Sequence, residues 1–252
     1  MSSHWITLVC TAVSSVCGTI TLNPNNNNNN NSITLSDDGS NGGGTGSFTN
    51  SGSIDLGGGY ISIYVGGTAS FTNSGSIDLG GGYIQVSVGG TASLNNSGTG
   101  SISNGSITVS GYGGASMDNA SGASITNSNN NGASIELDDN GSGNGASFTN
   151  EGSISLDGEE YIITVTGSGS GTSSIYSLTN SGSITGGGIK VNDDGQGTAS
   201  IDNSGSIYTV IATIAVYRKP SVAIATKTLL FFIKLTAIDD TKGIGGTESR
   251  AF

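Results

Sequence analysis

A motif that recurs along residues 48–207 constrains the fold of this chain more than any other feature. It reads apolar-x-Asn-(Ser/Ala/Glu/Asn)-Gly-Ser-Ile, and its Asn residues are spaced by 23, 23, 23, 31, 30 and 23 positions. A fixed period of about 20–50 residues is typical of solenoids and other repeat proteins. The repeated apolar, Asn and Ile positions are Phe48, Asn50, Ile54, Phe71, Asn73, Ile77, Leu94, Asn96, Ile102, Met117, Asn119, Ile125, Phe148, Asn150, Ile154, Leu178, Asn180, Ile184, Ile201, Asn203 and Ile207.

Within one copy, apolar and polar residues alternate in three short runs. The runs are Ser53–Leu56, Tyr60–Val65 and Ala69–Thr72, and Gly or Asn residues bound them. Alternation with period 2 between such turn residues indicates strands. Three strands and three turns in about 23 residues predict one coil of a parallel β-helix. The chain is therefore predicted to be all-β, a solenoid of about seven or eight coils.

Equivalent residues of successive coils are expected to stack, because a single coil cannot bury its own apolar side. A coil spacing of about 4.8 Å places Phe48, Phe71 and Leu94 in one buried column. The repeated Asn is predicted to lie at a coil corner, where Asn tolerates a positive φ. Stacked Asn side chains can also hydrogen-bond to one another as an amide ladder.

Charge and glycine content divide the chain near residue 208. Residues 1–207 carry 15 Asp and Glu against one Lys, and residues 208–252 carry three acids against six bases; 41 of the 44 Gly precede residue 208. An acidic body of this kind repels phosphate, so nucleic-acid binding is not expected. We interpret 32–207 as the β-helix and 208–252 as an atypical apolar and basic tail, either a cap or sequence read out of frame.

The N-terminal segment has two interpretations. Residues 1–31 are read as a signal sequence or an N-terminal cap, followed by an Asn-rich lead-in; the apolar stretch lacks the preceding Lys or Arg that a signal usually has. Cys10, Cys17 and His4 are too few for a zinc site, and whether the two Cys pair stays open. Lys227 and Lys234 interrupt the apolar tail and argue against a membrane-spanning helix. No cofactor is predicted.

Two sets of acidic residues are candidates for chemistry. Asp55 and Asp78 occupy the same place in neighbouring coils, near the carboxylate separation of about 5 Å that retaining glycosidases use. We expect them on an open face without a basic partner, which argues against an enzyme. Weak candidates for a cation site are the acidic pairs Asp138, Asp139, Asp193 and Asp194, which we expect in solvated turns.

Other surface features suggest binding rather than catalysis. Tyr60 and Tyr83 are expected to stack, as a platform for sugar rings or as a partly buried column. The two long periods require insertions, for which Ser128–Gly132 and Gly167–Gly171 are the candidates. Such loops are frequent binding elements in solenoids.

The segment Phe71–Ile77, followed by Gly80–Gly82, resembles repeats of bacterial autotransporter passenger domains and filamentous-haemagglutinin-like adhesins. The resemblance covers residues 32–207 and implies a secreted, right-handed β-helix that serves as an adhesin or surface stalk. Relatives of that kind usually add a long signal, a larger passenger and a membrane β-barrel. No barrel sequence is recognised here, so a fragment, a truncated gene product or a distant relative is expected.

The functional hypothesis is thus a structural or adhesive β-helix at the extracellular or bacterial cell surface, without catalysis. Its expected partner is a host-surface glycan or a matrix protein, with self-association end to end or along an edge. Alternatives are a carbohydrate-active β-helix enzyme and a non-functional fragment of a larger passenger.

Overall fold

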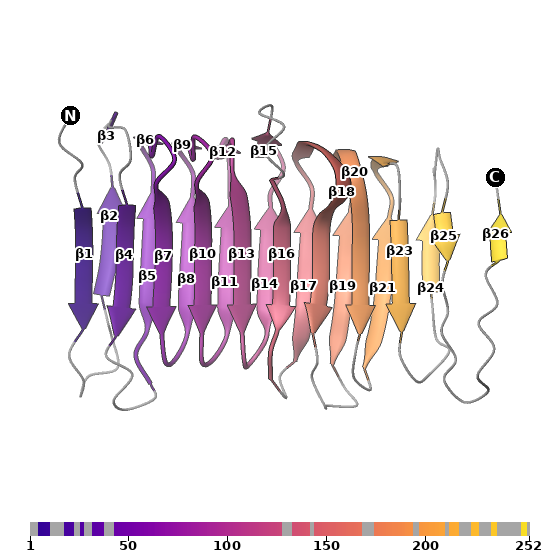
Figure 1. Ribbon diagram of the computed structural model, residues 1–252, viewed down its shortest axis with the longest axis horizontal. Coiled ribbons are helices and arrows are strands. Elements are labelled where there is room, and N and C mark those ends of the chain that lie inside the picture. Colours follow the sequence, from indigo (N-terminus) through magenta and orange to yellow (C-terminus); the bar gives the residue numbers. More distant parts are fainter. Residues whose placement is uncertain are drawn as a thin grey trace.

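The chain folds into a stack of β-coils along one long axis (Figure 1). The computed structural model describes residues 43–127, 133–141, 144–167, 174–193 and 197–209, and strands at 5–10, 18–22, 26–27, 32–37, 212–216, 223–226, 233–235 and 248–250. Across these residues the structure contains strands and turns but no helix. The strands form a 17-stranded and a 9-stranded sheet, and all but one of their pairings are parallel. The predicted parallel β-helix is confirmed.

The strands follow one another without interruption by other elements. Their bounds are β1 (Trp5–Cys10), β2 (Gly18–Leu22), β3 (Asn26–Asn27), β4 (Ser32–Asp37), β5 (Gly46–Asn50), β6 (Ser53–Asp55), β7 (Tyr60–Val65), β8 (Ala69–Asn73), β9 (Ser76–Asp78), β10 (Tyr83–Val88), β11 (Ala92–Asn96), β12 (Ser101–Ser103), β13 (Ser106–Gly111), β14 (Ala115–Asn119), β15 (Ser124–Asn127), β16 (Ile135–Asp139), β17 (Gly145–Asn150), β18 (Ser153–Gly167), β19 (Ile175–Asn180), β20 (Ser183–Asp193), β21 (Thr198–Asn203), β22 (Ser206–Thr209), β23 (Ala212–Val216), β24 (Ala223–Thr226), β25 (Ile233–Leu235) and β26 (Glu248–Arg250).

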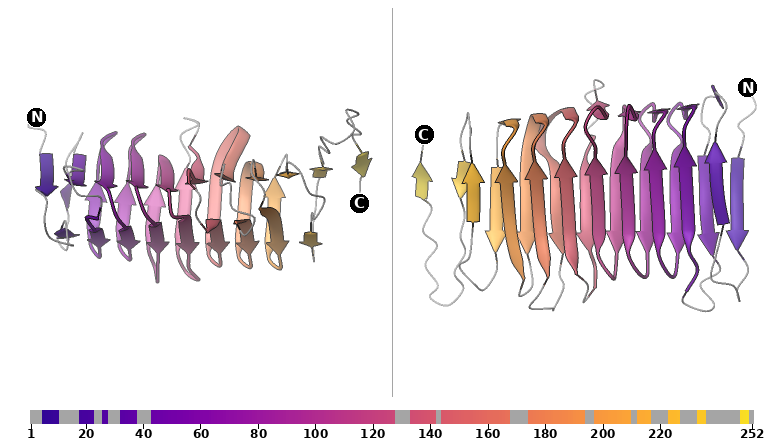
Figure 2. Two further views of the ribbon diagram at one scale, coloured as in Figure 1. Left: turned by 90° about the horizontal axis from the view of Figure 1, so that it is seen from below. Right: turned by 180° about the vertical axis from the view of Figure 1, so that it is seen from behind.

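One coil contributes three strands, as β8, β9 and β10 illustrate. The first strand of each coil joins the 9-stranded sheet, and the other two form two further columns. The long strands β18 and β20 bend from one of these columns into the other, which unites them as the 17-stranded sheet. Each strand pairs in parallel with its equivalent one coil later, as the views from other sides show (Figure 2). This register turns the sequence period into columns of side chains.

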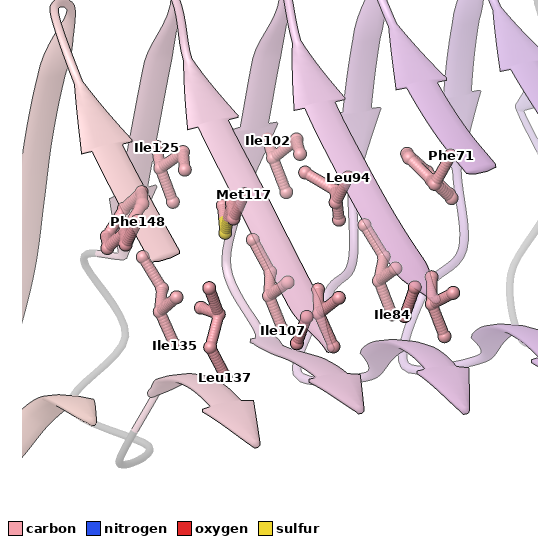
Figure 3. Packing of buried hydrophobic residues seen from close by; sticks show 14 of the residues in the cluster. Phe71, Ile84, Leu94, Ile102, Ile107, Met117, Ile125, Ile135, Leu137 and Phe148 are labelled. Atoms are coloured by element: carbon pink, nitrogen blue, oxygen red, sulfur yellow. The ribbon is translucent and has the colours of Figure 1, made fainter. Parts of the chain in front are cut away.

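Apolar columns fill the interior of the stack (Figure 3). The repeated apolar residues pair in register from Phe48 to Ile201, and the repeated Ile residues pair from Ile54 to Ile207. The rings of Phe48 and Phe71 stack with centroids 4.7 Å apart. All of these side chains are buried. Burial of one such side chain contributes about 1.5–3 kcal/mol. Each side chain is buried by the equivalent residues of the coils before and after it, so each coil is stabilised mainly by contact with its neighbouring coils.

The repeated Asn residues form a buried amide ladder beside the apolar columns. The Nδ2 of each Asn donates to the Oδ1 of the next, from Asn50 to Asn203, over distances of 2.7–2.9 Å. The same Nδ2 lies within hydrogen-bond distance of the carbonyl that opens the strand of the following coil, as Asn73 does with Ser101 at 3.2 Å. The ladder therefore joins each coil to the next through side chains that water does not reach.

The expectation that this Asn adopts a positive φ is wrong. Each ladder Asn is the last residue of its strand, and Asn104 is the one non-glycine residue with a positive φ in the described part of the chain, at 59°. The corner follows the Asn rather than passing through it, at Ser74-Gly75 for example. The ladder requires Asn at these positions because its side-chain amide donates one hydrogen bond and accepts another.

Asn104 explains how the coil from Asn96 to Asn119 keeps the 23-residue period despite two extra residues before Ile102. The corner between Asn96 and Ile102 spans six positions, whereas the same corner between Asn50 and Ile54 spans four. The next corner, from Ile102 to Ile107, spans five positions, whereas the equivalent one from Ile77 to Ile84 spans seven. The tight turn at Asn104-Gly105 removes the two residues that the previous corner gained. A Cβ at Gly105 would lie 2.6 Å from the Cβ of Leu79, so the shortened turn needs glycine there.

The longer coils keep the columns in register. The 30-residue spacing includes β18, whose pairing with β20 shifts between Leu156 and Ile163. Of the two predicted insertions, Ser128–Gly132 lies outside the described residues, and of the other only Gly167 is described, as the last residue of β18. The ladder distances across both coils stay at 2.7–2.8 Å, so the additional residues leave the stack intact.

Strands beyond the predicted repeat region also join the stack. In the N-terminal segment β1 pairs in parallel with β4, and β2 pairs with β5. In the C-terminal segment β23 pairs with β20 and β24 with β21, while β26 is antiparallel to β25. The domain boundaries themselves stay a prediction.

Candidate functional site

Asp55 and Asp78 pair in register, as the sequence suggested, but their carboxylates serve the turns. The Oδ1 of Asp55 accepts a hydrogen bond from the amide of Gly57, and the Oδ1 of Asp78 accepts one from Gly80 and another from the Nδ2 of Asn104. The equivalent residues in later coils are Ser103, Thr126, Ser155 and Thr185. A pair of carboxylates engaged in this way is suited to fixing turns rather than to acid–base chemistry.

An acidic cluster lies on β16, where Glu136 and Asp138 point outward and Asp139 points inward. Burial above all, and then the like charges of Glu136 and Asp139, raise the pKa of Asp138; hydrogen bonds with Asn140 and Thr166 act in the opposite direction. The fold therefore disfavours ionisation of Asp138.

Asp139 and Asp193 do not lie in solvated turns, which corrects the expectation for the acidic pairs. Both are fully buried. The carboxylate of Asp139 accepts hydrogen bonds from the amides of Gly141 and Gly145, at 3.2 and 3.0 Å, and so closes the loop between β16 and β17. Charge-assisted bonds to backbone amides are the usual reason that a carboxylate can be buried. Asp194 lies outside the described residues.

The column that holds Asp139 and Asp193 changes character along the stack. It begins with Val65 and Val88 and continues through Gly111, Asp139, Gly167 and Asp193. Tyr176 fills the space beside Gly167, since a Cβ there would lie 2.8 Å from its hydroxyl oxygen. Tyr176 itself stands where the neighbouring coils have Ala146 and Ala199. A large residue in one column thus compensates for a missing side chain in the next.

The acidic candidates do not gather into a metal centre. Within the described ranges, no three His, Cys, Asp or Glu side chains are placed to hold an ion together. Asp139 and Asp193 share a column but are separated by the coil of Gly167. His4 and Cys17 lie outside the described residues, and for Cys10 only the backbone, in β1, is described. The described residues also include no helix of the length and apolarity that crossing a membrane would need.

Tyrosines gather on the outward face of β7 and β10. The rings of Tyr60 and Tyr83 stack with centroids 5.2 Å apart and planes at 7° to each other. Tyr83 is 41% exposed and Tyr64 is 54% exposed, whereas Tyr60 is half-buried. The two predicted aromatic residues are therefore brought together, with an exposed ring at one end of the stack.

A polar face that the sequence interpretation passed over covers the 9-stranded sheet. One of its outward columns is serine in seven consecutive coils, at Ser47, Ser70, Ser93, Ser116, Ser147, Ser177 and Ser200. The hydroxyl of Ser93 donates to the carbonyl of Ala69, so part of the column is tied to the coil before. The signal was present in the sequence as the polar residue that precedes each repeated apolar residue. The serine column is regular and uncharged, whereas the other outward column of this face includes the exposed Asp118 and Asp202.

Comparisons of this chain with protein-family models, with curated proteins and with solved structures give no match. The fold, a parallel β-solenoid built from repeats, is compatible with β-helix repeat proteins in general. What the protein does has to be inferred from its own surfaces.

Proposed function

We propose that this protein is a structural or adhesive β-helix of the extracellular space or a bacterial cell surface, and that it acts without catalysis. The observation that carries the proposal is the amide ladder, which runs through seven coils from Asn50 to Asn203 and holds them in one register. Such a ladder produces an extended body with repeating outer faces. Extended repetitive surfaces are suited to display and adhesion.

Adhesion by such a body depends on repetition rather than on one deep site. The serine column presents one hydroxyl side chain in each of seven consecutive coils, about 4.8 Å from the next. Many weak contacts made together raise avidity without any strong single contact. We assign a host-surface glycan or a matrix protein as partner. The formal charge of −11 disfavours nucleic acid.

The resemblance to autotransporter passengers and filamentous-haemagglutinin-like adhesins supports the location. Those proteins use repeats of the same kind as Phe71–Ile77 in surface-exposed β-helices. Open strands at the ends of a solenoid can also pair with another copy, so end-to-end or edge self-association is part of the proposal.

A carbohydrate-active enzyme is the less favoured function. The carboxylates of Asp55 and Asp78 accept hydrogen bonds from the turns that follow them, and one acceptor atom of Asp78 already has two donors. A hydrolase requires an acid and a base that are free to exchange protons with a substrate.

The test is an array of immobilised glycans and matrix proteins, run beside a polysaccharide-cleavage screen. Binding of the full chain without release of reducing ends is expected. Turnover that disappears on Asp55→Asn or Asp78→Asn would replace the adhesive function with an enzymatic one. Absence of binding across the array, with the chain folded by circular dichroism, would contradict adhesion.

A further inference from the structure

The tyrosine stack on the outward face of β7 and β10 ends abruptly. The position before the first inward Ile of successive coils holds Ser32, Tyr60, Tyr83, Ser106 and Ser134. Because the two rings stack along the axis of the coils, one face of each ring points toward the preceding coil and the other face points toward the following coil. One face of Tyr83 is covered by Tyr60, and the other is turned toward the coil of Ser106, whose side chain is too short to cover a ring.

Exposure and hydrogen bonding agree with an open face of the Tyr83 ring above a small ledge, which Ser106 and Ser134 form. Tyr83 is 41% exposed, whereas Tyr60, whose other side faces the coil of Ser32, is half-buried. The Oγ of Ser106 accepts a 3.3 Å hydrogen bond from the amide of Ser134, which holds the ledge in place. The two serine positions extend the ledge over two coils beyond the ring.

We propose that the face of Tyr83 above Ser106 binds a neutral pyranose ring of a glycan, which continues the Tyr60–Tyr83 stack over this ledge. The inference rests on the proposed adhesive function and names its ligand class. A pyranose is flat enough to stack and carries C–H groups on its faces. The negative face of an aromatic ring attracts such groups, as it does the positive edge of another ring.

Polar groups suited to sugar hydroxyls lie two residues further along the same strands. Gln85 on β10 and Thr108 on β13 pair in register, and both are half-buried on the same outward face as Tyr83 and Ser106. An amide and a hydroxyl each donate and accept, so they can satisfy a hydroxyl of either orientation. Stacking at one end and hydrogen bonds at the other are how a shallow site fixes a sugar.

The charges around the ledge select a neutral sugar over an acidic one. The first Lys or Arg of the chain is Lys190, so no cation on the neighbouring coils can pair with a uronate, sialate or sulfate. Two coils past Tyr83, β16 places Glu136 and Asp138 on the same outward face. Like charges at this distance are repelled, and the repulsion weakens with salt.

The decisive experiment measures binding of cellohexaose and maltohexaose to the full chain by NMR titration, with oligogalacturonate of the same length as the acidic comparison. At least one neutral hexasaccharide is expected to bind and the acidic one is not. Tyr83→Ala should weaken binding at least about tenfold, which corresponds to about 1.4 kcal/mol. Tyr83→Phe, which keeps the ring, should retain most of it.

Ser106→Leu provides the sharper variant, because it covers the open face of Tyr83 with an aliphatic side chain and leaves both rings in place. The fold is expected to be retained while sugar binding is lost. Tyr112→Ala is the matched control, since Tyr112 is 62% exposed in the turn after β13 and should not affect binding. Circular dichroism and unfolding midpoints establish that each variant is folded.

The outcomes separate this inference from the proposed function. If the chain binds the glycan or matrix array but Tyr83→Ala and Ser106→Leu bind as well as the parent, the ledge is not the site and the adhesive function stands. If a hexasaccharide binds at Tyr83 while the array gives nothing, the ledge stands and adhesion falls. If sedimentation shows a dimer that Tyr83→Ala dissociates, and no hexasaccharide binds, a second copy occupies the face and the proposal is overturned.

Discussion

The Nδ2 of Asn119 donates a 2.8 Å hydrogen bond to the Oδ1 of Asn150, although 31 residues separate them in the chain. The same bond joins Asn50 to Asn73 over 23 residues, also at 2.8 Å. Coil length therefore does not determine the ladder. Additional residues are accommodated at the corners, and the buried amides keep the axial register that any binding surface on this protein depends on.

Asn96→Ala is expected to destabilise the chain by about 2–4 kcal/mol. The change removes the acceptor of Asn73 and the donor to Asn119, and leaving a buried polar group unsatisfied costs about 1–3 kcal/mol. Chemical unfolding followed by tyrosine fluorescence measures the effect. The matched control is Asn95→Ala on the same strand, which is exposed and should change stability by less than about 0.5 kcal/mol. Equal effects of the two changes would contradict the ladder.

Phe71→Ala is expected to cost about 3–5 kcal/mol, because it opens a cavity in a packed column. Phe71 is fully buried and stacks on Phe48, with Leu94 on its other side. Phe71→Leu should cost only about 1–1.5 kcal/mol, since the next coil already accommodates Leu at this position. Unfolding midpoints in urea compare the two variants. A Phe71→Leu variant as unstable as Phe71→Ala would show that the column requires the ring.

The columns and the strand order could be predicted because they depend on periodicity alone. Alternation placed Ile77 inward within its coil, and the recurrence of the motif placed it on Ile54 and below Ile102. Both inferences need only that strands have a side-chain period of 2 and that coils stack in register. The same argument applied to Ile135, Leu137 and Asp139 puts Asp139 inside, which the composition of the acidic pair concealed.

Compensation between coils could not be predicted, because it depends on volumes in three dimensions. Tyr176 replaces an Ala of its column only because Gly167, in the adjacent sheet, leaves room for the ring. Likewise the tight turn at Asn104 is intelligible only against the longer corner that precedes Ile102. The sugar ledge has the same origin, since it depends on which side of Tyr83 the next coil leaves uncovered.

Asp138→Asn is expected to remove part of the change in unfolding free energy between acidic and neutral pH. The folded-state pKa of Asp138 is raised, first by burial and then by Glu136 and Asp139, so the folded chain binds the proton more tightly than the unfolded chain. The stability from this proton is present below the ordinary aspartate pKa and is lost as the pH rises through the raised value. The variant should therefore be the more stable protein at neutral pH, and its advantage should shrink on acidification. Unfolding midpoints between pH 3 and pH 8 measure the difference; a difference that does not change with pH would contradict the assignment.

Glycine is required in the corners for two separate reasons, which substitution by Ala and Asn should distinguish. A methyl group at Gly82 would overlap the carbonyl oxygen of Gly59 in the coil before, whereas Gly98 has open space around it and a φ of 59°. Gly82→Ala should destabilise by about 1–3 kcal/mol as an overpacked contact, and Gly82→Asn should be no better. Gly98→Ala should cost about 1 kcal/mol for its left-handed backbone, and Gly98→Asn should recover most of that loss, because Asn adopts this conformation readily. The unfolding midpoints of the four variants are compared with that of the parent chain. If Gly82→Asn is more stable than Gly82→Ala, or if Gly98→Asn is no more stable than Gly98→Ala, the two corners do not differ as their geometry indicates.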